Sequence, residues 1–483
     1  MKSAALGIFS LIAVLIFTFT LGFIWTGSAG VQYKRVAMTG DQSTAVILEE
    51  WRKNMQGEAE DVDTEVMDQG YGDMKMTGAG SGGGGDNTVI WINIPGFRGD
   101  YIEQAAAAFM QKMADEGAAT TRMRPNFPPV TYAGHTTMAT GTTTNIHGIP
   151  SDVFRVGGPG GTIVNRPMDS SLLEAEPIWE TATRQEMPTL VHDWPLSQNQ
   201  TGENKAAYFL TEFDPEATDE QRLDRLWEAW TSHQGDKKLR LLMCRLDDIL
   251  MAGRINGPRA DETYEAVKKT DALLQAFVEK TKAAWSNLRG TKDGNLAFLI
   301  TTDHGLAELD KNINFKQLMG PEIMNNLEVA AHDAIAHLYF KNLPEGAAEA
   351  NLRKDQIDSE LKKRIYFRTY KQEDLPSDWK YSSAGGRVGD RVLVLKTGFA
   401  FSDVEAEEPV FNPSEGDGFY GGFGYPVSDS IRMSGQVILW GYPQQVSYGD
   451  MGEIDQTVFH STVCKLLKIK TSEKASDKTL SLQ

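Results

Sequence analysis

TVIWINIPGFRGDY (88–101) is the stretch of the chain that decides the fold. Its first seven residues are dominated by valine, isoleucine and tryptophan, which predicts a short buried strand. The PGFRGDY segment predicts a turn, and the alanine-rich pattern at 101–117 predicts a helix. A strand that leads through a turn into a helix is the building unit of an α/β fold.

Four further apolar runs and one long amphipathic run extend this pattern. Because buried strands that alternate with helices form parallel sheets, we predict a mostly parallel sheet with helices on both faces. Ligand sites in such sheets lie beyond the carboxyl ends of the strands, so the segments after the strands are the ones to search. The predicted strands are LRLLMCRL (239–246), NLAFLITT (295–302), RVLVLKTG (391–398) and QVILWGY (436–442), and the long helix is predicted at 260–285.

The N-terminus carries an uncharged apolar run from Ala4 to Trp25. A helix of about 22 residues, at ~1.5 Å per residue, spans the ~30 Å hydrocarbon core of a bilayer. The apolar core of a cleaved signal peptide is usually only about 7–15 residues long. We therefore predict a transmembrane anchor within residues 1–30, with a cleaved signal sequence as the alternative. The anchor predicts a single-pass membrane protein with its large domain outside the bilayer; extracellular, lumenal and organellar compartments all fit.

Composition divides the rest of the chain. Residues 31–86 predict a stalk that ends in a glycine-rich linker, TGAGSGGGG (77–85), whose glycines cannot pack a core. Residues 87–470 are long enough for one large domain. The polar tail, residues 471–483, is expected to be frayed.

Charge and cysteine content exclude some classes of function. The 483 residues have a formal net charge of −18, and an acidic surface repels polyanions, which argues against binding to nucleic acid. The two cysteines, Cys244 and Cys464, form neither a disulfide framework nor a metal-binding spacing, and we expect both thiols to be buried.

Seven pieces of the sequence, in order along residues 88–468, resemble the nucleotide pyrophosphatase/phosphodiesterase family of the alkaline phosphatase superfamily. The resemblance implies an alkaline-phosphatase-like α/β fold for residues 87–470. The pieces are WINIPGFRGDY (91–101), FPPVTYAGHTTMATGTTTNIHGI (127–149), EPIWETATRQ (176–185) with HDWP (192–195), GRINGP (253–258), LITTDHG (299–305), EDLPSDWKY (373–381) and GGFGYP (421–426).

The resemblance also implies two divalent metals, usually zinc, that stabilise the attacking and leaving oxygens of a phosphoryl transfer. It places Thr131 at the position of the nucleophile. For the metal that activates this threonine, it places Asp303 and His304 at two ligand positions. The third ligand, an aspartate in the family, is Pro95 here, and proline has no side-chain donor for a metal.

The second metal loses every ligand that the resemblance implies. Leu250, Arg254 and Phe423 stand where the family has an aspartate and two histidines, and none of the three can bind zinc. Gly134 stands where the family has an asparagine that contacts phosphate. A shift of register that brings a neighbouring carboxylate toward the site is one alternative, and Asp247 or Asp248 would supply it.

The retained residues also have structural interpretations. Thr131 is a good helix N-cap, Asp303 can bond its own turn, and His304 can be a hydrogen-bonded core residue. His135 and His147, in the nucleophile segment, are expected to be structural.

Arg254 has two interpretations as well. Its guanidinium can fill the empty metal site by pairing with Asp303 or Asp248. Alternatively, with Arg98, it can hold an anion against the N-terminus of the Thr131 helix.

Three functions follow. The first is a catalytically inactive family member that serves as a membrane-tethered scaffold or as a subunit of a membrane complex, with no cofactor. The second is a metal-dependent phosphodiesterase or phosphatase that uses Thr131 with a single zinc at Asp303 and His304. The third is a binder of a small phosphate or nucleotide without catalysis.

Overall fold

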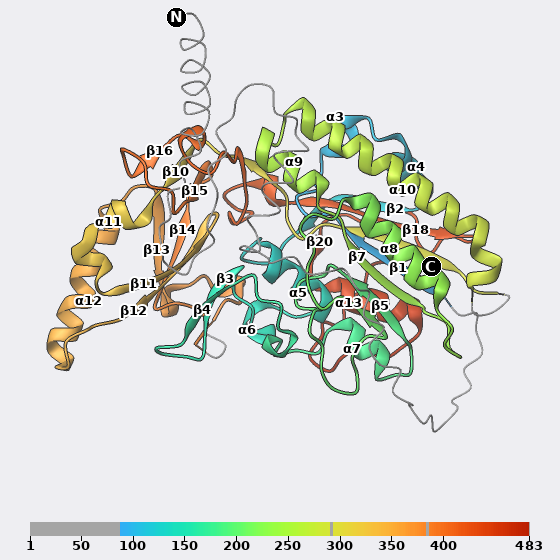
Figure 1. Cartoon of the computed structure of the whole chain (residues 1–483), viewed down its shortest axis with the longest axis horizontal. Coiled ribbons are helices and arrows are strands. Elements are labelled where there is room, and N and C mark those ends of the chain that lie inside the picture. Colours follow the sequence, from blue (N-terminus) through green and yellow to red (C-terminus); the bar gives the residue numbers. More distant parts are fainter. Residues whose placement is uncertain (1–86, 290–292, 383–385, 483) are drawn as a thin grey trace, which may run out of the picture.

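β1 (Thr88–Asn93), the strand that opens the large domain, lies inside a sheet of nine strands (Figure 1). The computed structural model describes residues 87–289, 293–382 and 386–482. The sheet has the order β19-β2-β18-β8-β1-β7-β5-β6, with β20 paired to β2. Its other strands are β2 (Ala118–Arg124), β5 (Thr189–His192), β6 (Tyr208–Phe209), β7 (Leu241–Arg245), β8 (Leu296–Thr301), β18 (Gly435–Tyr442), β19 (Gly449–Asp450) and β20 (Ile454–Asp455).

Helices cover both faces of this sheet, as predicted. One face packs against α3 (Tyr101–Ala105), α4 (Ala108–Glu116), α8 (Asp219–Ser232) and α10 (Asp261–Leu288). The other face packs against α5 (Thr131–Thr140), α7 (Ile178–Thr183) and α13 (Val458–Leu467). Alternate residues of β1 point to the two faces, so Ile90 and Ile92 join the first core and Val89 and Trp91 join the second.

A smaller lobe lies beside the large sheet (Figure 1). Its antiparallel sheet has the order β11-β12-β14-β13, and α11 and α12 pack beside it. Its elements are β11 (Leu327–His332), β12 (Ile335–Phe340), β13 (Phe367–Lys371), β14 (Arg391–Leu395), α11 (Phe315–Met324) and α12 (Ala347–Lys362). Three small sheets pair β3 (Val153–Val156) with β4 (Thr162–Asn165), β9 (Ala307–Glu308) with β17 (Gly421–Gly422), and β10 (Lys311–Ile313) with β15 (Phe399–Phe401) and β16 (Val410–Phe411).

Two predicted strands take different places from those expected. The run at 391–398 forms β14 in the antiparallel sheet of the small lobe, and the run at 436–442 forms β18, which is antiparallel to β8. Both strands are almost entirely buried. A continuous apolar run indicates burial on both faces of a strand, but it does not identify the partner strand or its direction.

The polar tail is ordered, contrary to expectation. Leu480 is only 3% exposed and belongs to the core that α13 forms on the sheet. Its backbone N–H donates to Thr462 Oγ1 at 2.8 Å, and Ser476 N–H donates to the carbonyl of Gly141 at 2.8 Å. The segment docks through Leu480, and the partly buried Leu482 packs against the same core.

Among the helices of the described residues, none has the length and hydropathy that crossing a bilayer requires. The predicted anchor, stalk and linker, residues 1–86, lie outside the described residues.

Candidate functional site

The nucleophile position and its two retained partners meet at the carboxyl edge of the large sheet. β1 and β8 are parallel neighbours, with Asn93 opposite Thr301, so Pro95 and Asp303 leave the sheet side by side. Thr131 is the first residue of α5, which packs on the same edge. Segments more than 170 residues apart are thereby brought together, as the resemblance implies.

His304 connects the retained residues. Its Nε2 lies 3.3 Å from Thr131 Oγ1 and 3.3 Å from Asp303 Oδ2. Its Nδ1 lies 2.7 Å from the carbonyl oxygen of Gly305, which can only accept, so Nδ1 carries the hydrogen. Nε2 is therefore the ring nitrogen that faces the hydroxyl and the carboxylate, and all three side chains are buried.

His135 is a member of the site that sequence reasoning treated as structural. Asn93 Nδ2 donates to its Nε2 at 2.9 Å, and the orientation of the amide is fixed because Asn93 Oδ1 accepts from Thr301 Oγ1 at 2.9 Å. Nδ1 of His135 therefore carries the hydrogen and faces both the Thr131 carbonyl, at 2.8 Å, and Asp303 Oδ2, at 3.2 Å. Its place four residues after Thr131 on α5 is the signal that could have identified it.

Asp303 is an ionised carboxylate without ordinary hydrogen bonds. Burial alone would raise its pKa, but His304 and His135 beside it outweigh burial and lower the pKa of Asp303 to about 2. Neither of its oxygens accepts a well-formed hydrogen bond from any described residue. The prediction that Asp303 bonds its own turn is therefore wrong.

Thr131 does not cap its helix either. It already has helical conformation, and Val130 is the N-cap residue. The carboxylate of Asp152 takes the capping role, since Tyr132 N–H donates to Asp152 Oδ1 at 2.7 Å. An anionic side chain thus already satisfies an amide at this helix N-terminus.

Two donor separations in this half of the site match those around a single cation. Donors that surround zinc at ~2.0 Å in a tetrahedron stand about 3.3 Å apart, which is the separation of His304 Nε2 from both Thr131 Oγ1 and Asp303 Oδ2. However, no group of three or more His, Cys, Asp and Glu side chains suited to a metal occurs within the part of the chain that the structure describes.

A salt bridge and two aromatic rings lie where the resemblance implies a second metal. Arg254, on α9 (Asp248–Asn256), donates from Nη1 to both carboxylate oxygens of Asp333, at 2.9 and 2.8 Å. Its guanidinium lies 4.4 Å from the ring centre of Phe419 and 5.0 Å from that of Phe423. Phe423 stacks on His304 with ring centres 4.2 Å apart. These residues leave no donor set for zinc at this half of the site.

Leu250 and Gly134 close the remaining space. A Cβ atom on Gly96, next to Pro95, would lie 3.1 Å from Leu250 Cδ1. A Cβ atom on Gly134 would lie 3.0 Å from Asp303 Cβ, so an asparagine there would crowd the strand end. The glycine at position 134 is therefore matched to the close approach of α5 to Asp303.

The expected partners of Arg254 and Arg98 need correction. Arg254 binds Asp333, in the turn between β11 and β12, rather than Asp303 or Asp248 as expected. Arg98 makes a two-point contact with Asp100, at 2.9 and 2.6 Å, which uses the donors that an anion would need. Neither arginine has the geometry predicted for an anion site.

The proposed shift of register is also wrong. Asp247 binds Arg245 at 2.7 Å and Asp248 binds Lys269 at 3.0 Å, so both carboxylates have cationic partners outside the site.

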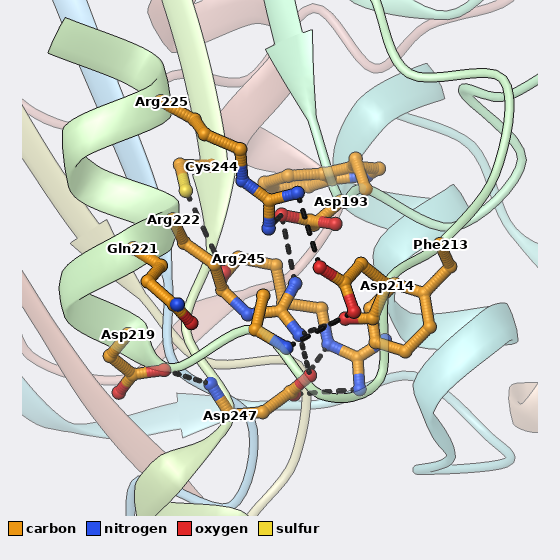
Figure 2. A network of polar contacts seen from close by, with 12 residues as sticks. Asp193, Phe213, Asp214, Asp219, Gln221, Arg222, Arg225, Cys244, Arg245 and Asp247 are labelled. Atoms are coloured by element: carbon orange, nitrogen blue, oxygen red, sulfur yellow. Dashed lines mark hydrogen bonds and ion pairs between the residues drawn. The ribbon is translucent and has the colours of Figure 1, made fainter. Parts of the chain in front are cut away.

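A buried ionic network flanks the site at the ends of β5 and β7 (Figure 2). Arg222 is fully buried, 2.8 Å from Asp193 and 3.6 Å from Asp247. The ring of Phe213 lies against two guanidinium groups, those of Arg222 and Arg245. Because all these charges have partners, the network supports the strand ends rather than offering a binding site.

A second chain of polar contacts links the lobes. Arg166 donates from Nη2 to His332 Nε2 at 2.7 Å, and His332 Nδ1 lies 3.4 Å from Asp152. Burial, followed by the charge of Arg166, lowers the pKa of His332 to about 4, so this ring is neutral. The contacts run from the turn of the small lobe to the cap of α5.

His147, by contrast, bonds Thr137 and lies outside the site, in agreement with its structural interpretation.

Comparison with known proteins gives a consistent result. The family model described as type I phosphodiesterase/nucleotide pyrophosphatase matches residues 89–418, more than half of the chain. An uncharacterized pyrophosphatase/phosphodiesterase of Schizosaccharomyces pombe is 26% identical over 62% of this chain and 60% of its own length. Ectonucleotide pyrophosphatase/phosphodiesterase family member 1 of Mus musculus is 22% identical over 78% of this chain and 40% of its own length. The chain thus spans less than two thirds of both relatives.

The fold has solved counterparts. Murine ectonucleotide pyrophosphatase/phosphodiesterase 5 superposes with a TM-score of 0.67 at 20% identity, over 82% of this chain and 98% of that one. The same protein has been solved as an inactive threonine-to-alanine variant in complex with AMP, with the same TM-score. At this level of identity, the likeness shows the mixed α/β fold.

Proposed function

Because the chain belongs to the type I phosphodiesterase/nucleotide pyrophosphatase family, we propose that it is a catalytically inactive member that serves as a membrane-tethered scaffold or as a subunit of a membrane complex. The observation that carries the proposal is the pairing of Arg254 with Asp333 where the resemblance implies a metal. A guanidinium held between a carboxylate and Phe423 cannot share that space with a second cation. Under this proposal, one of the two metal centres that two-metal catalysis requires is missing.

The membrane part of the proposal is supported by sequence alone. The apolar run from Ala4 to Trp25 is long enough to span a bilayer, and the linker at 77–85 would separate the anchor from the domain. A tether that holds an inactive domain at a membrane suits a role in assembly. Partners would be other proteins of that membrane, and the acidic surface argues against nucleic acid.

The test combines metal content with turnover. We expect the full chain, purified after exposure to excess zinc, to hold far less than two zinc ions per chain by mass spectrometry. With a chromogenic phosphodiester and added zinc, its rate should equal that of the Thr131→Ala variant. Turnover that exceeds this matched control would overturn the proposal, because it would require a working nucleophile.

A second candidate function rests on the spacing of Thr131, Asp303 and His304. These donors could hold one zinc, which would supply a Lewis acid beside the hydroxyl. The Pro95→Asp variant, which replaces the missing ligand, provides the measurement. If the half-site is intact, zinc should raise the thermal midpoint of Pro95→Asp more than that of the natural chain, since a ligand at ~100 times its Kd stabilises by about 2.7 kcal/mol.

The control for this measurement is Pro95→Asn, which has a similar volume and no charge. Equal responses of the aspartate and asparagine variants to zinc would eliminate the one-metal candidate. A response of Pro95→Asp that disappears on adding Asp303→Asn would support it.

A further inference from the structure

The loop between β5 and β6 carries a sequence motif that the site does not use. Asn199, Gln200 and Thr201 form an Asn-X-Thr acceptor sequence for N-linked glycosylation. It is the one such sequence in the chain, because the only other candidate, at Asn412, has proline in the middle position. We propose that Asn199 carries an N-linked glycan. The proposal rests on the membrane placement argued above, with the large domain on the lumenal or extracellular side.

The loop presents the acceptor side chains outward. Asn199 and Thr201 are exposed, whereas Gln200 between them is 6% exposed. Gln200 anchors the loop from inside, since its amide donates to the Ser197 carbonyl at 2.7 Å and accepts from Ala206 N–H at 2.8 Å. The buried middle residue therefore holds the two flanking side chains on the surface.

The backbone suits asparagine at the acceptor position. Asn199 has φ of 50°, in the left-handed region that asparagine tolerates better than most residues. Gly202, three positions later, has φ of 90° and open space around its missing side chain. The loop thus turns sharply beside the acceptor and leaves room for a bulky substituent.

The folded contact of Asn199 is compatible with the linkage. Its Nδ2 donates to the Met168 carbonyl at 3.1 Å. In the transfer, Nδ2 forms a bond to the anomeric carbon of an oligosaccharide carried on a lipid diphosphate. The bond from that carbon to the diphosphate oxygen breaks, and one amide proton is released. The second amide hydrogen remains, so Asn199 can still donate to Met168.

The experiment expresses the full chain in cultured eukaryotic cells and treats it with peptide-N-glycosidase. We expect one discrete gain in gel mobility, together with an aspartate at position 199 in the released peptide by mass spectrometry. Asn199→Gln and Thr201→Ala should each abolish the shift. Asn204→Gln, a change of the same kind outside the motif, should leave it intact.

A second acceptor in the linker separates the two ways in which the proposal can fail. The double change Gly82→Asn and Gly84→Ser creates an Asn-Gly-Ser sequence there. Modification of the linker without modification of Asn199 would overturn the glycan while leaving the membrane placement standing. Modification of neither would overturn the lumenal or extracellular placement and, with it, the glycan.

Discussion

Replacing Arg254 should destabilise the protein because it leaves Asp333 charged and buried. The two side chains are 6% and 3% exposed and make a two-point contact. The Arg254 charge is the largest favourable influence that holds the pKa of Asp333 below its ordinary value against burial. Removing one partner of such a pair costs about 3–5 kcal/mol. We take Arg254→Met as the perturbation, since methionine keeps most of the volume against Phe419 and Phe423.

The expected shift in the melting temperature follows from the size of the domain. An unfolding entropy of ~2.1 cal/mol/K per residue over roughly 380 residues converts 1 kcal/mol into about 1.2 °C. Arg254→Met should therefore lower the midpoint by about 4–6 °C in differential scanning calorimetry. The combined change Arg254→Met and Asp333→Leu should recover most of the loss, because replacing both members of a buried pair with apolar groups is often neutral.

The control is a pair on the surface. Arg122 and Asp450 are 2.8 Å apart, but their side chains are 55% and 68% exposed. Exposed pairs contribute about 0–1 kcal/mol, so Arg122→Met should move the midpoint by no more than about 1 °C. A shift for Arg254→Met as small as that control, or a double variant as unstable as the single one, would refute the claim that this salt bridge is a buried ionic contact at the position where the resemblance implies a metal.

Three further predictions concern stability elsewhere in the domain. Burial lowers the pKa of His147 to about 3, so the unfolded chain binds a proton at this residue that the folded chain does not bind. The free energy of unfolding should therefore fall as pH drops from about 6.5 toward 3. His147→Gln should reduce the difference in thermal midpoint between pH 7 and pH 5. An unchanged difference would contradict this assignment. Burial and the neighbouring Asp248 raise the pKa of Asp219, so the folded chain keeps a proton that the unfolded chain releases. The free energy of unfolding should therefore decline as pH rises above the usual pKa range of aspartate. Asp219→Asn should reduce the change in thermal midpoint between pH 5 and 8. A decline as steep as that of the natural chain would show that Asp219 is not its source. Leu480→Ser should cost about 2–3 kcal/mol in denaturant unfolding, whereas the exposed Lys478→Ser should cost almost nothing, and equal effects would mean that the tail does not dock in solution.

Sequence reasoning recovered the parts of the fold that local patterns encode. β1, β7 and β8 are continuous apolar runs, and the turns that follow them carry the site residues. The resemblance brought Thr131, Asp303 and His304 together correctly, since parallel neighbours end at one edge of the sheet. Two of the substituted positions also lie beside this site, since Arg254 contacts Phe423 and Phe423 stacks on the ring of His304.

The sequence did not predict the partner residues that lie far away along the chain. Asp333 is 79 positions from Arg254, in a hairpin turn of the small lobe that carries no motif. Asp152, which caps α5, lies 20 positions beyond Tyr132, whereas capping motifs in a sequence involve only residues next to the helix start. The prediction that placed residues 391–398 in the large sheet was wrong for a related reason. The apolar content of a strand indicates that the strand is buried, but it does not indicate the sheet to which the strand belongs. In each of these three cases, tertiary packing determines the partner residue or partner strand.

The substitutions at the site are consistent with one another when charge is counted. The resemblance implies three aspartates around two divalent cations, at positions 95, 250 and 303. With the cations gone, three buried carboxylates would repel one another, and each would carry an uncompensated cost of several kcal/mol. Two of the three are replaced by Pro95 and Leu250, and the third, Asp303, keeps two histidines within 3.3 Å. Under the proposed loss of the metals, replacement of the carboxylates is what folding requires, whereas tuning of catalysis would have kept the charges in place.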